Sequence, residues 1–302
     1  MDLPSHWYAV ALSQEVRPGQ ILPLMRFGQA LVFWRNQEGV LSVMEDRCPH
    51  RFARLSGGAI VDGTLQCPFH GLQFDSQGRC EFVPELECSA PQIGVKVYPT
   101  VEKGGWIWLG WGASVQDLPL PEWFSEVDSS LTALWKERWD THLSRSIENQ
   151  LDYAHLPFVH RRSIGRFAGP VNRRPEMQMD ERRIRWCFTP EGQKKSFIEF
   201  RFPNIWINWI SDRYAITLAF VPVSETCTEL YLQNHRRFLN IPLLNPLLDY
   251  FMIAMNRKIL KEDQRVVLTQ TPQDVRAAQG EALLPSDQAI IHFRKWLSSG
   301  SV

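Results

Sequence analysis

The sequence predicts an α+β protein of two domains, an all-β domain followed by one that combines strands with helices. Three observations support this prediction. The chain has 302 residues, and a domain usually has ~100–200. Hydrophobic residues make up 44% of it, which is enough to build substantial cores. Short β-rich runs fill the first third, whereas longer helical patterns follow strands near the C-terminus.

The first domain is predicted from runs of β-branched and aromatic residues punctuated by Gly, Asn and Pro, a pattern typical of a small sandwich or barrel. The expected strands are residues 30–34, 40–44, 94–98 and 106–109. Gly and Pro residues punctuate the stretch from Gly110 to Pro121. We therefore expect a first domain at residues 1–115 and a second at 116–302.

The second domain is predicted to contain a hairpin and two late helices. The expected strands are residues 204–209, 214–221 and 228–238, and the last two are joined by a segment of hairpin length, Pro222 to Cys227. The expected helices are residues 246 to about 269 and 286 to about 297, the second with Ser286 as its N-cap after Pro285.

The charge balance argues against a polyanionic partner. Lys and Arg together number 33, as do Asp and Glu, so no excess positive charge favours nucleic acid or an anionic membrane. No apolar run approaches the ~18 residues of a membrane-spanning helix. The N-terminus lacks an export signal, so we expect a cytoplasmic protein. Six cysteines are too few for a disulfide scaffold and are better interpreted as metal ligands or buried thiols.

Cysteines and histidines occur in two mixed pairs within the first domain. Cys48-Pro49-His50 is followed by sixteen residues and then by Cys67-Pro68-Phe69-His70. A zinc finger groups two cysteines and then two histidines, so this order does not fit it. It suits a binuclear iron cluster in which Cys48 and Cys67 hold one iron and His50 and His70 the other. The alternative is two chance pairs of buried residues.

These two segments resemble a Rieske [2Fe-2S] domain, over roughly residues 5–112. Leu72 is a departure, because the oxygenase branch of that family usually has tryptophan there. Rieske subunits of respiratory complexes have an extra cysteine in each ligand loop, whereas residues 48–55 and 67–74 contain none beyond the two ligands. The resemblance therefore favours the oxygenase or ferredoxin type. The other cysteines, interpreted as small buried hydrophobic residues, are Cys80, Cys88, Cys187 and Cys227.

A second constellation lies at the start of the second domain. Asn149, Asp152 and His155 are spaced three apart, so on a helix they would form one polar stripe. Pro157 would turn the chain so that His160 approaches the same point as His155. Two imidazoles and a carboxylate on one face make the site that a mononuclear iron(II) oxygenase needs. The alternative is a surface helix with two incidental histidines.

Asp152, His155 and His160 resemble the D-x2-H-x4-H motif of Rieske non-haem iron oxygenases, and with this match the resemblance spans nearly the whole chain. The family's carboxylate ligand comes from a late helix within an acidic pair, which Glu262-Asp263 resembles. The resemblance implies a helix-grip second domain. It also implies that Asp152 is not an iron ligand but carries electrons from a cluster histidine of a neighbouring subunit, matched by His70.

Helix geometry favours Asp263 over Glu262 as the third iron ligand. Apolar Ile259, Val266 and Val267 lie at i−4, i+3 and i+4 from Asp263, which places it centrally on the buried stripe. The same residues match Glu262 less well. The second acid of the pair is also the ligand in the family that the chain resembles.

The resemblance implies a terminal oxygenase with two cofactors, a Rieske [2Fe-2S] cluster and a mononuclear ferrous iron. It would activate O2 at the mononuclear iron and hydroxylate a small cyclic or aromatic organic molecule. A separate reductase or ferredoxin would supply electrons to a homotrimer. Two alternatives are a monooxygenase that removes N- or O-methyl groups and a non-catalytic Rieske electron carrier. Candidates for substrate contact, from their place on the predicted sheet, are Trp206, Asn208 and His235.

Overall fold

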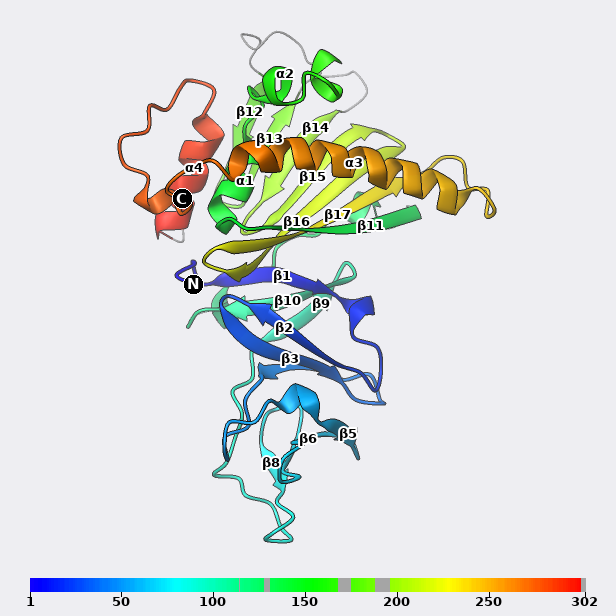
Figure 1. Ribbon diagram of the computed structural model, residues 1–302, viewed down its shortest axis with the longest axis vertical. Helices are drawn as coiled ribbons and strands as arrows, with labels where there is room; N and C mark the ends of the chain where they lie inside the picture. Colours follow the sequence, from blue (N-terminus) through cyan, green and yellow to red (C-terminus); the bar gives the residue numbers. More distant parts are fainter. Residues whose placement is uncertain (114, 128–130, 168–174, 188–195, 300–302) are drawn as a thin grey trace. The chain divides into compact units, whose positions relative to one another are not determined.

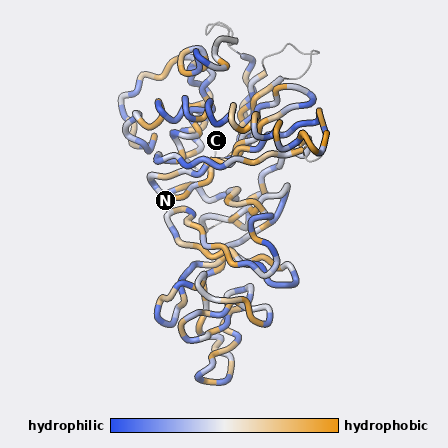
Figure 2. The backbone as a smooth tube through the Cα atoms, turned by 45° about the vertical axis from the view of Figure 1, so that its right-hand side comes forward, coloured by the Kyte–Doolittle hydropathy of each residue, from blue (hydrophilic) through white to orange (hydrophobic). Residues whose placement is uncertain are grey.

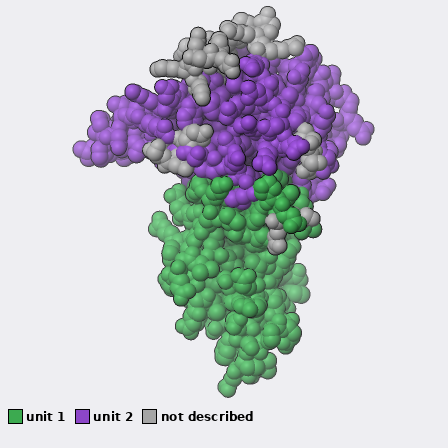
Figure 3. All heavy atoms as spheres, turned by 180° about the vertical axis from the view of Figure 1, so that it is seen from behind, with its two compact units in different colours: residues 1, 5–119 green, residues 2–4, 120–302 purple. Residues whose placement is uncertain are grey.

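The computed structural model describes residues 1–113, 115–127, 131–167, 175–187 and 196–299. These divide into two units, residues 1 and 5–119 and residues 2–4 and 120–302 (Figure 3). The regular structure of unit 1 consists of strands and short 3₁₀ turns, whereas unit 2 joins an antiparallel sheet to α-helices. The predicted α+β class, with an all-β part first, is confirmed.

Unit 1 contains two three-stranded sheets, β1-β10-β9 and β2-β3-β4, and a four-stranded sheet, β5-β6-β7-β8. Its strands are β1 (His6–Leu12), β2 (Ile21–Arg26), β3 (Gln29–Arg35), β4 (Leu41–Glu45), β5 (Ala59–Val61), β6 (Thr64–Gln66), β7 (Gln73–Phe74), β8 (Cys80–Phe82), β9 (Thr100–Lys103) and β10 (Trp106–Trp111). Its 3₁₀ turns are η1 (Ser13–Glu15), η2 (Leu55–Gly57) and η3 (Val115–Asp117).

The predicted strand at residues 94–98 is wrong. Gly94 forms an isolated bridge with Arg79, and Val97 forms one with Met44. The segment thus changes partner halfway along, so its β-branched residues never join a continuous ladder. The other three predicted strands correspond to β3, β4 and β10.

Unit 2 is built on one seven-stranded antiparallel sheet in the order β11-β17-β16-β15-β14-β13-β12. Its strands are β11 (Leu131–Trp139), β12 (Glu176–Met179), β13 (Arg183–Cys187), β14 (Phe197–Arg201), β15 (Ile205–Ser211), β16 (Tyr214–Ser224) and β17 (Cys227–Arg236). Its helices are α1 (Leu143–Leu151), α2 (Leu156–Val159), α3 (Asn245–Val267) and α4 (Gln288–Ser299), with 3₁₀ turns η4 (Ser125–Val127), η5 (Ile164–Phe167) and η6 (Val275–Ala277). Helices α1 and α3 pack against this sheet (Figure 1).

The predicted hairpin and late helices are present with shifted ends. Strands β16 and β17 continue into the predicted connection as far as Ser224 and Cys227 and leave a tight turn. Helix α4 begins at Gln288, not at Ser286, and Asp287 immediately precedes it. Its side chain accepts from the Leu284 amide at 2.6 Å, and its carbonyl accepts from the Ile291 amide.

Hydropathy changes repeatedly along each unit, so that strands and helices have apolar and polar positions interleaved (Figure 2). Such alternation is typical of elements with one buried face. Among the described residues, no helix has the length and apolar character needed to cross a membrane.

Candidate metal centres

Two loops of matching geometry present the cysteine and histidine pairs of unit 1. In the first loop the Cys48 amide donates to the Ala53 carbonyl, and the Phe52 amide donates back to the Cys48 carbonyl. The second loop repeats both bonds, from Cys67 to Leu72 and from Gly71 to Cys67. The residue four places after each cysteine has a positive φ, 62° at Phe52 and 74° at Gly71. The two loops are therefore copies of one turn.

Within these cysteine loops the thiols are buried and the imidazoles are exposed. Cys48 and Cys67 are 1% and 2% exposed, whereas the rings of His50 and His70 lie on the surface with centroids 4.5 Å apart. Burial raises the pKa of the Cys48 thiol to about 11, because a thiolate loses its hydration there. A metal that replaces the thiol protons would offset this penalty. The donor set of two buried thiols and two exposed imidazoles fits a Rieske cluster.

The hydrophobic core beneath the loops accommodates Leu72. Its side chain is 4% exposed and belongs to a cluster of buried residues that includes Leu65 and Phe74. All six cysteines are free. Of the four not in the motif, Cys80 and Cys227 are buried and Cys187 is half-buried, but Cys88 is exposed, so the expectation of burial is wrong for Cys88.

In unit 2 the helix predicted to carry the polar stripe ends before the stripe is complete. Helix α1 stops at Leu151, and Asp152 is extended, with φ −94° and ψ 119°. The Asp152 carboxylate accepts from the Ala154 amide at 2.7 Å. This local bond competes with continuation of the helix, so Asp152 and His155 do not share a helical face as predicted.

His155 and His160 instead flank the single turn of α2. Pro157 lies in the first turn of this helix, where no amide partner is required, and Leu156 before it is helical. The two histidines therefore approach one another as expected, but Pro157 contributes to this by beginning a helical turn rather than by turning the chain out of a helix. The His155 carbonyl accepts from the Val159 amide, and the Leu156 carbonyl accepts from the His160 amide. One helical turn thus brings the two imidazoles to a centroid distance of 5.3 Å.

Helix α3 contributes Asp263 from its inward face. Asp263 is 1% exposed, and the other buried positions of this helix are Met252, Asn256, Leu260, Glu262 and Val267. The predicted stripe is wrong at Val266, which is 45% exposed, because the inward face follows positions 260, 263 and 267. The inward direction of Asp263 itself is as expected.

His155, His160 and Asp263, which we call the triad, converge on one point. The Oδ1 atom of Asp263 lies 2.9 Å from Nε2 of His160 and 3.4 Å from Nε2 of His155. Neither approach has hydrogen-bond geometry, and this oxygen and both ring nitrogens of His155 are buried without a hydrogen-bond partner. All three ligand atoms lie within 4.8 Å of one another. Atoms that face a common point rather than each other fit a bound metal ion.

The charges of the triad support this geometry. Burial lowers the pKa of His155, but the carboxylates of Asp152 and Asp263 outweigh burial and raise it to about 9. Burial raises the pKa of Asp263, but the two imidazoles outweigh burial and hold it below its usual value. A metal cation would replace the imidazolium protons as the partner of this buried carboxylate.

Three further side chains orient the triad. Nδ1 of His160 donates to Glu262 at 2.9 Å, and the Ser163 hydroxyl donates to the same carboxylate oxygen at 2.5 Å. The Gln150 amide donates to Oδ2 of Asp263 at 3.4 Å. Glu262, the acid that the apolar pattern of the helix disfavours as a ligand, lies beside His160. Sequence reasoning missed Ser163 and Gln150, because no spacing motif marks a residue that contacts a ligand through the fold.

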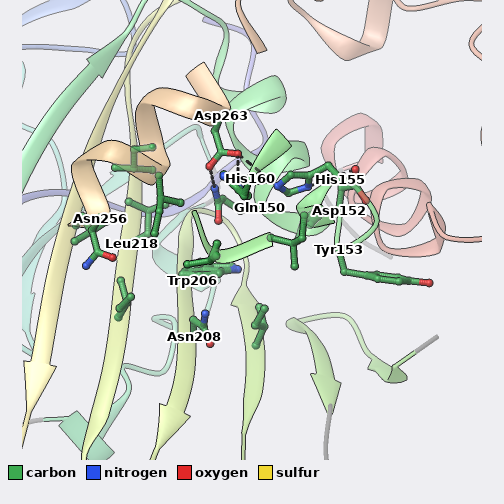
Figure 4. A pocket seen from close by; sticks show the side chains of 18 of the residues that line it. Gln150, Asp152, Tyr153, His155, His160, Trp206, Asn208, Leu218, Asn256 and Asp263 are labelled. Atoms are coloured by element: carbon green, nitrogen blue, oxygen red, sulfur yellow. Dashed lines mark hydrogen bonds and ion pairs between the residues drawn. The ribbon is translucent and has the colours of Figure 1, made fainter. Parts of the chain in front are cut away.

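The triad lines one side of a cavity of about 160 Å³ in unit 2. Figure 4 shows Asp263, His155 and His160 on one side, with Trp206 and Asn208 of β15 on the other. Asp152 and Tyr153 also line the cavity. His235 does not, because it points from β17 to the opposite face of the sheet, where Thr217 lies 2.7 Å from its Nε2. Two of the three candidates for substrate contact are therefore at the cavity.

Another group, His142, Glu225 and Asp274, brings three possible ligand atoms within 4.8 Å. Both carboxylate oxygens of Asp274 accept from Arg276 at 2.7–3.2 Å, and Arg276 also donates to Asp2. This group is better described as an ion-pair network than as a metal centre.

Comparison with known proteins accounts for both sites. Residues 6–99 match the family model of the Rieske [2Fe-2S] domain, and residues 139–202 and 188–299 match that of the vanillate O-demethylase oxygenase C-terminal domain. The chain belongs to the Rieske non-haem iron oxygenases. This membership confirms the resemblance in the sequence and the two cofactors of the family, a Rieske cluster and a mononuclear iron.

The related Rieske oxygenases include methylxanthine N1-demethylase NdmA of Pseudomonas putida, 30% identical over 275 residues that cover 84% of this chain and 75% of that protein. The oxygenase component of dicamba O-demethylase of Stenotrophomonas maltophilia is 35% identical over 161 residues, 51% of this chain and about half (47%) of that protein. A solved structure of a Pseudomonas putida NdmA mutant with theobromine has a TM-score of 0.82 at 25% identity, covering 97% of this chain and 89% of that one.

Proposed function

We propose that this Rieske oxygenase is a monooxygenase that removes a methyl group from oxygen or nitrogen of a small cyclic substrate. The observation that carries the proposal is the position of the triad at one end of an apolar cavity. The names of the relatives support it, since NdmA is an N-demethylase and the dicamba enzyme an O-demethylase. For a methyl ether the balanced reaction is R–O–CH3 + O2 + 2e⁻ + 2H⁺ → R–OH + CH2O + H2O.

The proposed ligands of the two cofactors follow from the donor sets. Cys48, Cys67, His50 and His70 would hold the cluster, and the triad would hold ferrous iron. Iron bound there would supply oxygen activation. The protein's own residues would perform the other tasks. Glu262 orients His160, and the cavity walls position the substrate and exclude water.

Electron supply is proposed to involve a separate protein and a second subunit. The dicamba relative is named as an oxygenase component, which supports a separate reductase or ferredoxin for this chain too. Exposed imidazoles at His50 and His70 suit transfer across an interface. Asp152, half-exposed and 3.5 Å from Nδ1 of His155, would then connect the triad to an adjacent subunit's cluster. A cytoplasmic location remains a prediction.

A homotrimer would also cover an apolar surface at the start of α3. Leu243, Leu244, Leu247, Tyr250 and Phe251 are all exposed, Leu243 by 92%. A contiguous patch of this kind marks an interaction surface in most proteins. Light scattering should report the mass of a trimer, and a monomer at working concentration would contradict this assembly.

Metal analysis and single turnover test the proposed function. Purified holoprotein should contain about three irons and two acid-labile sulfides per chain, whereas an electron carrier would contain about two irons. Protein reduced by dithionite, freed of excess reductant and mixed with O2 should release formaldehyde from members of a panel of methoxy- and N-methyl-arenes. Full iron content without formaldehyde from any compound would contradict demethylation.

A further inference from the structure

The two cysteine loops are copies of one turn, but they carry different charges. Their matching hydrogen bonds align Cys48 with Cys67 and Phe52 with Gly71, so each residue of one loop has a counterpart in the other. At three positions the first loop has arginine and the second has glutamine or histidine. The pairs are Arg47 and Gln66, Arg51 and His70, and Arg54 and Gln73. The first loop, residues 47–54, therefore has three arginines, and the second, residues 66–73, has none.

The second loop shows that the turn itself does not need these arginines. It forms the same two backbone hydrogen bonds with glutamine at the counterparts of Arg47 and Arg54. Packing does not need them either, because all three arginines of the first loop are exposed. Exposed charges that the local fold does not use are available to attract another molecule.

Aromatic rings hold two of the arginines at the surface. The guanidinium carbon of Arg47 lies 3.6 Å from the centroid of the Phe52 ring, and that of Arg51 lies 5.2 Å from the centroid of the Phe69 ring. Such cation–π contacts orient an arginine without neutralising it. In the described part of the chain neither arginine forms an ion pair, so both positive charges remain uncompensated.

Arg54 has a carboxylate nearby, but that carboxylate is engaged elsewhere. Asp46 lies 3.9 Å from Arg54 and accepts from both the amide and the hydroxyl of Ser56 at 2.7 Å. The Arg54 side chain is 69% exposed, and an exposed pair at this distance is weak. The first loop thus presents three positive charges in the segment that also carries the exposed imidazole of His50.

Phe52 is a further difference between the loops. Its φ of 62° lies in the left-handed region, which is strained for a bulky side chain, whereas its counterpart Gly71 adopts a φ of 74° without strain. The Phe52 side chain is nevertheless 63% exposed, so packing within unit 1 does not explain it. Strained residues cluster at functional sites, and aromatic residues and arginine are both enriched in protein interfaces. The first loop has these features together.

The surface beside the second loop has the opposite charge. Pro84 lies against Gly71, where an added Cβ atom would be 3.0 Å from the proline ring. Exposed Glu85 and Glu87 follow Pro84 in the chain. The charge therefore changes from positive at the first loop to negative near the second.

This charge distribution distinguishes two candidate partners of the first loop. One is the triad side of a second copy, where exposed Arg161 and Arg162 follow His160. The arginines of the first loop would repel these two, whereas the acids near the second loop would attract them. The other candidate is the separate electron donor. An acidic donor would be attracted to the first loop and repelled from the second, which leaves the second loop to the neighbouring subunit.

We propose that the first loop is the docking surface for an acidic electron-donor protein, which is attracted by Arg47, Arg51 and Arg54 and contacts Phe52. The electron enters at His50, in the same loop. In this step the donor loses one electron and the oxidised cluster gains it, and no covalent bond changes. This inference rests on the proposed function, which includes a separate donor, and it adds the charge and the docking site of that donor.

An acidic plant-type [2Fe-2S] ferredoxin is the probe, because its reduction potential lies below that of a Rieske centre. Oxidised ferredoxin should bind oxidised holoprotein in a calorimetric titration at low ionic strength, and added salt should weaken the binding steeply. Stopped-flow absorbance with reduced ferredoxin then follows cluster reduction in the absence of O2 and substrate. Failure to bind at low ionic strength, or binding that is indifferent to salt, would overturn the proposal.

Replacing arginines by their counterparts from the second loop tests the docking site. Arg47→Gln and Arg54→Gln should each slow cluster reduction by ferredoxin about threefold at low ionic strength, and the double variant about tenfold, with a weaker salt dependence. The visible spectrum should be unchanged, and reduction by dithionite, which needs no docking surface, should change little. Arg17→Gln is the matched control, because Arg17 is an exposed arginine of unit 1 outside both cysteine loops. Equal slowing by Arg17→Gln and Arg54→Gln would overturn the assignment to the first loop.

Phe52→Gly installs the residue that the second loop has at the same position. It should keep the cluster absorption, because glycine adopts the required φ without strain, and it should weaken ferredoxin binding. Unchanged binding would exclude Phe52 from the interface.

Further outcomes separate the donor from a second subunit and the docking site from the proposed function. Loss of the trimer in the Arg47→Gln/Arg54→Gln variant, measured by light scattering, would place the first loop at the subunit interface and overturn the proposal. If ferredoxin binds and reduces the cluster as expected but no formaldehyde forms in single turnover, the docking site holds and demethylation fails. If dithionite-reduced protein releases formaldehyde but ferredoxin neither binds nor reduces the cluster, demethylation holds and the docking site is wrong.

Discussion

Glu262 accepts a hydrogen bond from Nδ1 of His160 at 2.9 Å, and this contact leaves Nε2 of the same ring facing Asp263. Adjacent acids on α3 thus contact opposite nitrogens of one imidazole. A carboxylate can only accept, so the bond to Glu262 places a proton on Nδ1 and directs the Nε2 lone pair toward the proposed iron. The two acids therefore have different roles, one as a ligand and one as a support.

The first prediction separates these two roles. Asp263→Ala should lose the mononuclear iron, so that iron content falls from about three to about two per chain while the cluster remains. Glu262→Gln should still bind iron at saturation, with affinity reduced about 10–100-fold, because the support for His160 is weakened. Iron titration of both variants measures their iron content at saturation and their iron affinity. Iron loss at saturation from Glu262→Gln with full iron in Asp263→Ala would reverse the assignment.

The second prediction concerns electron transfer through Asp152. Asp152→Asn removes the charge but keeps an amide of similar size, so both metal sites should remain filled. Turnover should nevertheless fall about 10–100-fold or more, because Asp152 contacts His155 from outside the triad. The rate of cluster oxidation by O2 in the presence of substrate measures the effect. Loss of the mononuclear iron in this variant would instead make Asp152 necessary for metal binding.

The third prediction tests the cluster ligands with a pair of buried cysteines from unit 1. Cys67→Ala should abolish the visible absorption of the Rieske cluster, because a thiolate ligand is lost. Cys80→Ala removes a cysteine that is equally buried, 1% exposed, but lies outside the two cysteine loops. Its spectrum should be unchanged. Equal bleaching in both variants would indicate a general loss of fold rather than loss of a ligand.

The fourth prediction concerns the stability of unit 2 in acid. Burial lowers the pKa of His235 to about 4, whereas an unfolded histidine titrates near 6.5. Unfolding therefore takes up a proton below pH ~6.5, and the stability contributed by neutral His235 is lost as pH falls from about 6.5 toward 4. At pH 5 the loss should be about 2 kcal/mol. Urea unfolding at pH 7 and pH 5 should show a smaller loss for His235→Gln, and an identical loss would exclude His235 as the cause.

The fifth prediction concerns the ion pairs that join α1 to α4. Glu148 is buried and accepts from Arg145 at 3.1 Å and from Arg294 at 2.5 Å. Glu148→Gln should destabilise unit 2 by about 3 kcal/mol, because Arg145 stays buried with less compensating charge. Glu281 contacts the same two arginines from a more exposed position, so Glu281→Gln should have a much smaller effect. Thermal unfolding compares the two variants. Equal decreases in their unfolding temperatures would mean that burial does not determine how much each ion pair stabilises unit 2.

Much of the candidate site was predictable from spacing. The two Cys-His pairs and the Asp152-His155-His160 run are local patterns, and the inward face of α3 follows from apolar residues in the adjacent turns. The prediction of secondary structure failed where a side chain bonds to the nearby backbone or where a segment changes its strand partner. The Asp152 carboxylate accepts from the amide of Ala154, two residues on, where α1 ends, while residues 94–98 switch between two bridge partners. Neither event leaves a periodic signal.

The sequence by itself determined the family, the all-β first part and α+β second part, and the residue types available to each metal. Metal-ligand motifs and hydrophobic periodicity depend on residues that are close together in the sequence, so they can be recognised without the fold. Only the tertiary structure decided which side chains support the triad and which face the cavity. Ser163 reaches Glu262 across 99 positions, and Gln150 reaches Asp263 across 113. The direction of Trp206 and His235 depends on strand register, which places one toward the cavity and the other on the opposite face. Register is set by the packing of the whole sheet, so no local pattern encodes it.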